Sequence, residues 1–149
     1  MPETMRAMRI HELGGSFRLE TVPVPKPGPN DALLRLGATG VGLTLVIMRR
    51  TPGLISRYPR TMGHEIAGEV VEVGPEVRTV RPGDRVTAHF YLTCHNCNFC
   101  RSGRETLCPE FQGYVGLACD GGYAEYMTLP AVNLCKIPEG VSALDACVA

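Results

Sequence analysis

The chain has 149 residues, and its 44% hydrophobic content is enough for the core of one ordinary domain. Fifteen lysine and arginine residues balance fifteen aspartate and glutamate residues, so the net charge gives no reason to expect nucleic acid as a partner. No apolar run approaches the roughly 20 residues of a membrane span, and the N-terminus lacks the apolar core of a signal peptide. We therefore expect a cytoplasmic protein that binds neither nucleic acid nor a membrane.

The first informative segment is a glycine loop between an apolar run at 33–34 and a helix-like run, Leu43–Arg50. Strand, glycine loop and helix is also the order in which phosphate-binding loops are built. The glycines at 37, 40 and 42 are spaced G-x-x-G-x-G, which is not the G-x-G-x-x-G of a dinucleotide fold. The Gly-Lys-Ser/Thr of a P-loop is also missing, so the spacing argues against a nucleotide site here.

The remaining chain consists of short apolar segments separated by glycine and proline turns. Alternating or continuous apolar residues predict strands at 65–74, 84–90, 121–130 and 131–138. Many short strands with such turns are typical of a barrel or sandwich. We therefore predict a mainly β domain with short helices, arranged as a partly open β-barrel.

Seven cysteines are many for a chain of this length, and an odd number in a protein without secretion signals argues against a disulfide framework. Four of them, Cys94, Cys97, Cys100 and Cys108, are spaced C-x2-C-x2-C-x7-C. Four thiolates at about 2.3 Å complete the tetrahedral coordination of Zn²⁺. Because no coordination position stays open, we predict a structural zinc.

Other interpretations of this cluster fit less well. An iron–sulfur cluster also takes four cysteines, but the fourth comes too late here for the ferredoxin pattern, and a redox C-x-x-C normally has two cysteines at a helix start. We interpret His95, which lies inside the cluster, as an exposed loop residue because four thiolates already complete the shell. Cys119, Cys135 and Cys147 lack ligand-like spacing, so we expect them to be small packing residues.

Several segments in this order resemble the medium-chain dehydrogenase/reductase family, specifically its zinc-containing alcohol dehydrogenases. The segments are GHEIAGEVVEVG (63–74), RPGDRV (81–86), CHNCNFCRSGRETLC (94–108), DGGYAEYMTLP (120–130) and KIPEGVS (136–142). The resemblance implies a GroES-like catalytic domain over 1–149, with a structural-zinc lobe at about 91–112. It also implies a Rossmann domain that binds NAD or NADP and mediates homo-oligomer formation, and no segment of this chain resembles that domain.

The same resemblance points to the loop at 40–45 as the place of catalysis. In the family this loop carries a zinc-ligand Cys, a proton-relaying Ser/Thr and an Asp that supports the zinc-bound His. Here the three positions are Gly42, Thr44 and Leu45, so only the hydroxyl is kept. The resemblance further assigns His64 as a zinc ligand and Glu65 as an alternative ligand.

A third protein ligand is expected just beyond residue 149. Since a catalytic zinc takes about three protein ligands, we expect this site not to hold zinc in the usual way. Simpler roles are also open: His64 as a buried, hydrogen-bonded histidine, Glu65 as the partner of a cation, and Thr44 as a helix cap. His11 and His89 have no ligand-like spacing and are expected to be surface or packing residues.

Two functions remain. The first is the catalytic-domain portion of an NAD(P)-dependent oxidoreductase acting on a small alcohol, aldehyde or ketone, in which Thr44, His64 and Glu65 handle the substrate and its proton. This chain alone is then expected to be inactive. The alternative is a non-catalytic, zinc-stabilised binding or interaction module, which Gly42 and the missing cofactor domain favour.

Overall fold

A computed structural model describes residues 1–148. The strands in chain order are β1 (Thr4–Ile10), β2 (Arg18–Pro23), β3 (Asp31–Thr39), β4 (Arg60–Thr61), β5 (Ile66–Val73), β6 (Arg85–Ala88), β7 (Tyr91–Leu92), β8 (Gly113–Tyr114), β9 (Tyr126–Pro130) and β10 (Leu134–Lys136). The α-helices are α1 (Leu43–Met48), α2 (Asn98–Arg101) and α3 (Ala143–Ala146). Two 3₁₀ turns lie at Glu105–Leu107 and Ala131–Asn133.

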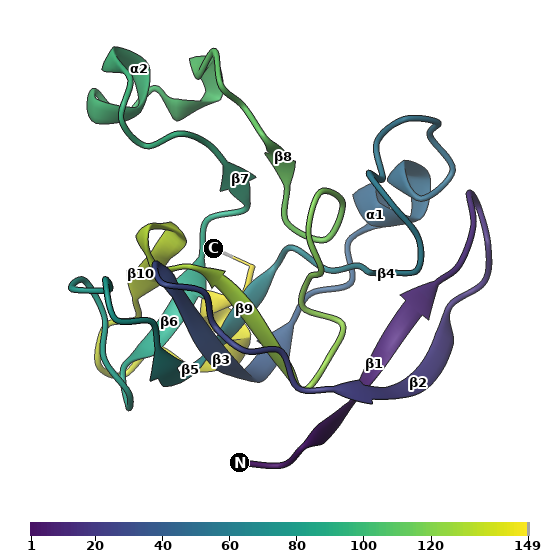
Figure 1. The fold of residues 1–149 in the computed structure, drawn as a ribbon, viewed down its shortest axis with the longest axis horizontal. Coiled ribbons are helices and arrows are strands. Elements are labelled where there is room, and N and C mark those ends of the chain that lie inside the picture. The colour runs from purple at the N-terminus through teal and green to yellow at the C-terminus, as the bar shows by residue number, and fades with distance from the viewer. Residues whose placement is uncertain (149) are drawn as a thin grey trace.

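The strands form antiparallel sheets that stay open rather than closing into a barrel (Figure 1). The central sheet has the order β10-β6-β5-β3-β9, and a second sheet has the order β2-β1-β4. The short pair β7–β8 forms the neck of a lobe that extends away from the two larger sheets in Figure 1. The lobe itself, residues 93–112, carries α2 and the first 3₁₀ turn.

The main core lies on one face of the central sheet. It includes Ile66 and Val70 of β5 together with Leu34 of β3, all fully buried. The alternation of β5 sends its other side chains to the opposite face, where Ala67 packs in a cluster with residues of α3. Both faces are therefore covered at the start of β5, where Ile66, Ala67 and Gly68 are all buried, whereas Glu69 and Glu72 lie farther along the strand where burial is incomplete.

The predicted mainly β class with short helices is confirmed. Helix α1 begins where predicted and ends two residues before Arg50, and the four predicted strand segments contain β5, β6, β9 and β10. The hairpin β1–β2 and helix α3 were not predicted. Within the described residues, no helix has the length and apolar character needed to cross a bilayer.

Candidate functional site

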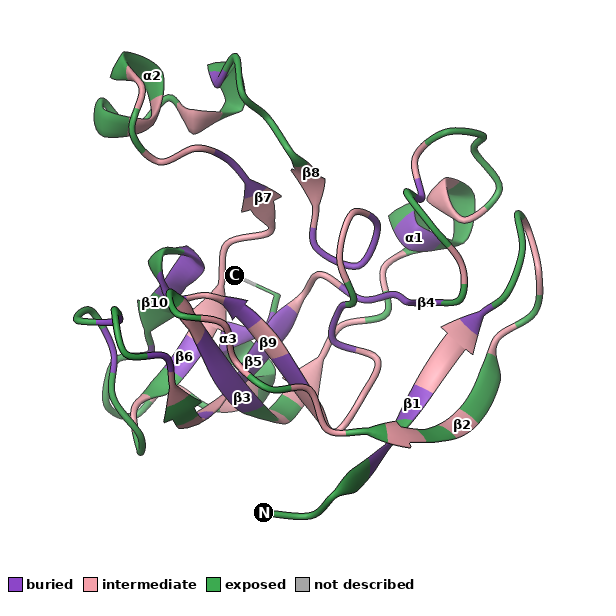
Figure 2. Cartoon of the chain, viewed as in Figure 1, coloured by how far each residue is buried: buried purple, intermediate pink, exposed green. Residues whose placement is uncertain are grey.

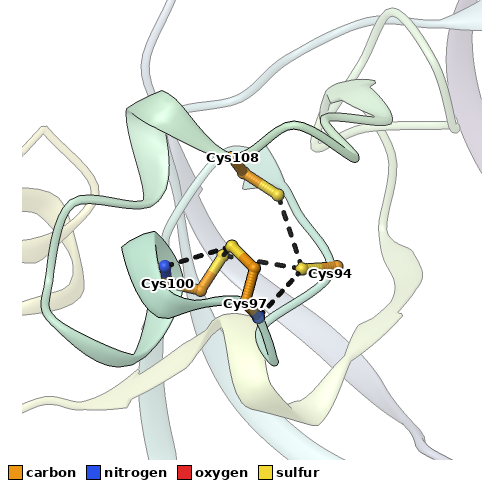
Figure 3. Close-up of side chains that lie close together, drawn as sticks. All are labelled: Cys94, Cys97, Cys100 and Cys108. Atoms are coloured by element: carbon orange, nitrogen blue, oxygen red, sulfur yellow. Dashed lines mark hydrogen bonds between the residues drawn. The ribbon is translucent and has the colours of Figure 1, made fainter.

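The four predicted cysteine ligands converge at the tip of the lobe (Figure 3). Their Sγ atoms all lie within 4.8 Å of one another. Cys94 is 3.9 Å from Cys100 and 3.5 Å from Cys108, and Cys97 is 3.5 Å from Cys100. Four sulfurs at the Zn–S distance of about 2.3 Å sit about 3.8 Å apart in a tetrahedron, so the cluster has the dimensions of a zinc-thiolate site.

The lobe backbone favours ionised sulfur at this cluster. The N–H of Cys97 donates to Cys94 Sγ at 3.3 Å, and the N–H of Cys100 donates to Cys97 Sγ at 3.5 Å. Backbone N–H groups of Asn96 and Cys97 lower the pKa of the Cys94 thiol to about 7, whereas burial raises the pKa of Cys100 to about 11. One thiol is thus ready to lose its proton near neutral pH, and a bound cation would favour loss of the others.

The second group of predicted residues is brought together by the pairing of β3 with β5. Their register shifts between Leu36 and Ala38, a β-bulge at the end of β3. Beyond it, the Gly40 N–H and the Thr39 hydroxyl both donate to the carbonyl of Glu65 at 2.9 Å. The bulge therefore fixes the glycine loop against the start of β5.

The Glu65 carboxylate fills the space beside two glycines of this loop. A Cβ on Gly42 would lie 2.9 Å from Glu65 Oε1, and a Cβ on Gly40 would lie 1.7 Å from Oε2. The carboxylate thus lies against position 42, the site that the family resemblance assigns to a thiolate ligand. No ion pair of Glu65 is present within residues 1–148, so the interpretation as a cation's partner finds no support.

His64 carries an unsatisfied polar atom. Its Nδ1 is buried without a hydrogen-bond partner among residues 1–148, and its ring stacks on Phe90 with centroids 4.9 Å apart. Burial lowers the pKa of His64, and the nearby Glu65 carboxylate only partly opposes this shift. The interpretation of His64 as a hydrogen-bonded core histidine is therefore not supported, because one of its ring nitrogens is buried without a partner among residues 1–148.

Tyr123 is a further site residue that sequence reasoning missed. Its hydroxyl is also buried without a partner, and burial followed by the charge of Glu65 raises its pKa. Tyr123 reaches the site because the loop before β9 pairs with the strand leading to His64: the Tyr123 N–H donates to Met62 O at 2.8 Å and the Gly122 N–H to Gly63 O at 2.9 Å. A Cβ on Gly63 would lie 2.8 Å from Tyr123 N, so this approach needs glycine.

Helix α1 carries the two remaining positions of the loop that the resemblance singles out, and it places them in different surroundings. Thr44 is exposed and does not cap the helix, since the N-cap is Gly42 and no side chain caps it. Leu45 is 2% exposed and packs with Ile10 and Met62 in the core. The position that the resemblance assigns to a supporting carboxylate has therefore become a core position.

Among the residues the structure describes, the only group of three or more metal-ligand side chains is the cysteine cluster. At the second site His64 and Glu65 offer two donors, where a catalytic zinc takes about three from protein. The donor set within residues 1–148 is therefore incomplete for a catalytic zinc.

Three smaller expectations turn out differently. His95 is partly buried rather than exposed, because its backbone turns back at φ 53° and brings Nε2 to 3.5 Å from the Thr93 hydroxyl. Cys135 is exposed rather than packed, because β10 is an edge strand and its alternation sends this side chain outward. Cys147 is buried and Cys119 partly buried, as expected of packing residues.

Apolar side chains surround the glycine loop on the surface. Val41, Leu43 and Ile47 are 78%, 80% and 68% exposed, and Figure 2 shows that most of α1 is exposed. Leu144 on α3 is also exposed. An apolar surface of this kind beside a candidate site suggests a substrate or another part of a longer protein as its cover.

Comparison with known proteins identifies relatives of this arrangement. Residues 28–139 match the family described as the alcohol dehydrogenase GroES-like domain. An L-threonine 3-dehydrogenase from Xanthomonas oryzae pv. oryzae is 40% identical over 146 residues, which covers 92% of this chain and 41% of that protein. The chain thus spans about two-fifths of the length of such relatives.

Two solved structures share the fold. A thermostable alcohol dehydrogenase from Pyrobaculum aerophilum, with cobalt and zinc bound, superimposes with a TM-score of 0.88 at 31% identity, covering 97% of this chain and 44% of that one. An acetophenone reductase from Geotrichum candidum, in complex with NAD, superimposes with a TM-score of 0.85 at 36% identity, covering 99% of this chain and 44% of that one.

Proposed function

Because the chain belongs to the alcohol dehydrogenase GroES-like domain family, we propose that it is the catalytic-domain portion of an NAD(P)-dependent oxidoreductase acting on a small alcohol, aldehyde or ketone. The observation that carries this proposal is the grouping of His64, Glu65 and the glycine loop, where buried polar atoms lack partners. Unsatisfied buried groups are costly and gather where a protein binds a ligand. The NAD(P)-binding domain and the subunit contacts of a homo-oligomer belong to the part of the protein outside this chain.

We assign the structural zinc to Cys94, Cys97, Cys100 and Cys108. The S–S separations and the N–H groups aimed at sulfur support this assignment. Four thiolates leave no open position, so the ion stabilises the lobe and takes no part in the reaction. Metal analysis of the purified chain should find about one zinc per chain.

The chemistry at the second site is assigned to this chain's own side chains. The Thr44 hydroxyl passes the proton between the substrate oxygen and solvent, and neutral His64 orients the substrate oxygen or accepts that proton. Glu65, as a carboxylate beside Gly42, receives a proton or orients His64. A zinc bound by His64 and Glu65 with a ligand from outside the chain would polarise the substrate oxygen.

Comparing a variant of Thr44 with a control variant of Thr51, both in the complete protein, tests whether the Thr44 hydroxyl relays the proton. Reduction of NAD or NADP is followed at saturating alcohol for Thr44→Val and for Thr51→Val, an exposed threonine just beyond α1. Loss of a proton-relaying hydroxyl should lower kcat roughly 100-fold, while the control should keep its activity. Equal activity in the two variants would remove Thr44 from the mechanism, and no turnover in the unmutated protein with any alcohol or ketone would overturn the function.

The alternative is a non-catalytic, zinc-stabilised interaction module. Gly42 in place of a ligand and Leu45 in the core favour it, because both changes reduce metal affinity. Both functions retain the structural zinc, so the measurement that separates them is hydride transfer in the complete protein, which an interaction module does not show.

A further inference from the structure

A pocket lies between the two larger sheets, away from the candidate reaction site. Its volume is about 490 Å³, within the range of small-molecule sites. Strands β1, β2, β4 and β9 line it, together with the loop at 118–121. Figure 1 shows where these strands lie in the fold. None of Thr44, His64 and Glu65 lines this pocket, so it is separate from the proposed reaction site.

The pocket is unusually rich in arginine. Arg9, Arg57 and Arg60 line it, against a single carboxylate, Asp120. Arg57 is exposed and forms no ion pair with any described residue. The lining therefore has more positive than negative groups, although the chain as a whole is neutral.

Arg60 is the buried anchor of this charge. Its side chain is only 2% exposed, and its guanidinium donates to Asp120 Oδ1 at 3.2 Å, Ser56 Oγ at 3.0 Å and Ala118 O at 3.2 Å. A guanidinium has five N–H donors, and Arg60 Nε remains buried without a partner. The same Asp120 oxygen also accepts the Thr61 N–H at 2.9 Å, so this carboxylate is shared rather than devoted to Arg60.

Arg9 repeats this pattern on β1. Its Nη2 donates to Pro59 O at 3.2 Å, and its Nη1 lies 3.6 Å from Glu20 Oε2, yet its Nε is buried and unpartnered. Two lining guanidiniums thus keep unused donors. These two Nε atoms are covered, so the attraction for an anion comes from the positive charge of the guanidiniums rather than from these donors.

Part of the pocket lining is apolar. Met5 of β1 and Met127 of β9 belong to it, together with Val22 and Pro23 of β2. A ligand that matches the whole lining needs an oxyanion head for the arginines and an apolar body for these side chains. Water alone would satisfy only the first requirement.

We propose that this pocket binds a small organic anion, with its carboxylate or phosphate paired to Arg57 and Arg60 and its apolar body against Met5 and Met127. Arginine is suited to this task because its planar fork matches the geometry of both oxyanions. The proposal concerns binding and does not depend on hydride transfer.

Calorimetric titration of the complete protein tests this proposal. Three probes are used: benzoate, phenyl phosphate and neutral benzamide. At least one anion should bind about tenfold more tightly than benzamide, and that preference should shrink at high salt. Comparing benzoate with phenyl phosphate shows which oxyanion the pocket prefers. Equal binding of benzamide and both anions, or no binding of any probe, would overturn the proposal.

Matched arginine variants locate the binding. Arg57→Ala should weaken anion binding about tenfold, whereas Arg101→Ala, an exposed arginine on α2 in the lobe, should change it less than twofold. Thr128→Asp places a carboxylate in the pocket lining and should weaken anion binding but not benzamide binding. If anion affinity is the same in Arg57→Ala and Thr128→Asp as in the unmutated chain, the anion binds elsewhere and the assignment is wrong.

Discussion

The cysteine lobe and the glycine loop are the two places where the family resemblance puts a metal, and only the lobe contains the full set of donor residues that the resemblance expects. In the lobe all four donor atoms are present and lie within 4.8 Å of one another. At the glycine loop one donor position is Gly42 and a supporting position is the buried Leu45. By this resemblance the lobe holds a complete set of four thiolates, whereas the loop region offers only His64 and Glu65 as donors within residues 1–148.

The two regions also differ in how their polar groups are satisfied. Backbone N–H groups donate to two of the lobe's sulfurs, whereas His64 Nδ1 and the Tyr123 hydroxyl have no partner. Each unsatisfied buried group costs about 1–3 kcal/mol. The lobe therefore contributes to stability, and the loop region tolerates a cost that a ligand would offset.

The largest effect is expected in the lobe. Cys97→Ser removes one of four thiolates, and zinc content should fall from about one per chain to near zero because the tetrahedral set is broken. The melting temperature should fall by roughly 10 °C, since loss of a metal site is among the most destabilising single changes. Elemental analysis and thermal unfolding measure the two effects.

Cys135→Ser is the matched control for that variant. Cys135 is exposed and lies outside the cluster, so both the zinc content and the melting temperature should stay unchanged. Zinc retained at full occupancy in Cys97→Ser would contradict the four-cysteine assignment. Zinc lost in both variants would point to general unfolding instead.

The next effect concerns the fit between Gly40 and Glu65. In Gly40→Ala the new Cβ would meet Glu65 Oε2 at 1.7 Å, so the carboxylate must move. We expect a loss of roughly 1–3 kcal/mol in the free energy of unfolding, more than the small gain from replacing glycine. Denaturant unfolding measures it, and the double variant Gly40→Ala/Glu65→Ala should recover part of the loss. Purely additive losses would mean that the two residues do not compete for this space.

A gain of metal is expected from Gly42→Cys. A thiolate at position 42 would join His64 and Glu65 as a third protein donor, and the Glu65 carboxylate, 2.9 Å from the new Cβ, is a flexible side-chain end that can shift. Zinc content should rise from about one toward about two per chain. Gly42→Ser is the control, because it has similar size without a thiolate. If both variants stay at one zinc, the thiolate alone does not restore the site, and the missing carboxylate at position 45, where the structure has the buried Leu45, limits zinc binding instead.

Much of the lobe was predictable because its four ligands lie within fifteen consecutive residues. Spacing alone brought Cys94 and Cys108 into one group, and the structure places their sulfurs 3.5 Å apart. The strands at 65–74 and 121–130 were predictable for a similar local reason, their apolar pattern.

The second site was harder to predict because chain segments far apart in sequence build it. A strand-like pairing of 121–123 with 61–63 holds Tyr123 beside the segment that leads to His64, and no local pattern reveals this pairing. The hairpin β1–β2 was missed because β2 breaks the expected alternation: the apolar Leu19 is exposed, whereas the charged Glu20 is partly buried. The contact of Glu65 with Gly42 likewise could not be predicted, because the sequence indicated only that the expected ligand at position 42 was missing.

The smallest expected effect concerns the unpartnered hydroxyl of Tyr123. It shows whether this hydroxyl only lowers the free energy of unfolding or also contributes to substrate binding. Tyr123→Phe removes an oxygen that is buried without a partner, so the free energy of unfolding should stay level or rise by up to about 1 kcal/mol. Tyr114→Phe, in the aromatic group beside the lobe, is the control and should bring no such gain. Chemical denaturation measures both. A clear destabilisation by Tyr123→Phe would mean that the hydroxyl has a partner, such as an ordered water, and that the loop region is better satisfied than its direct contacts indicate. A gain in stability together with weaker substrate binding in the complete protein would show that the loop region keeps this cost for its ligand.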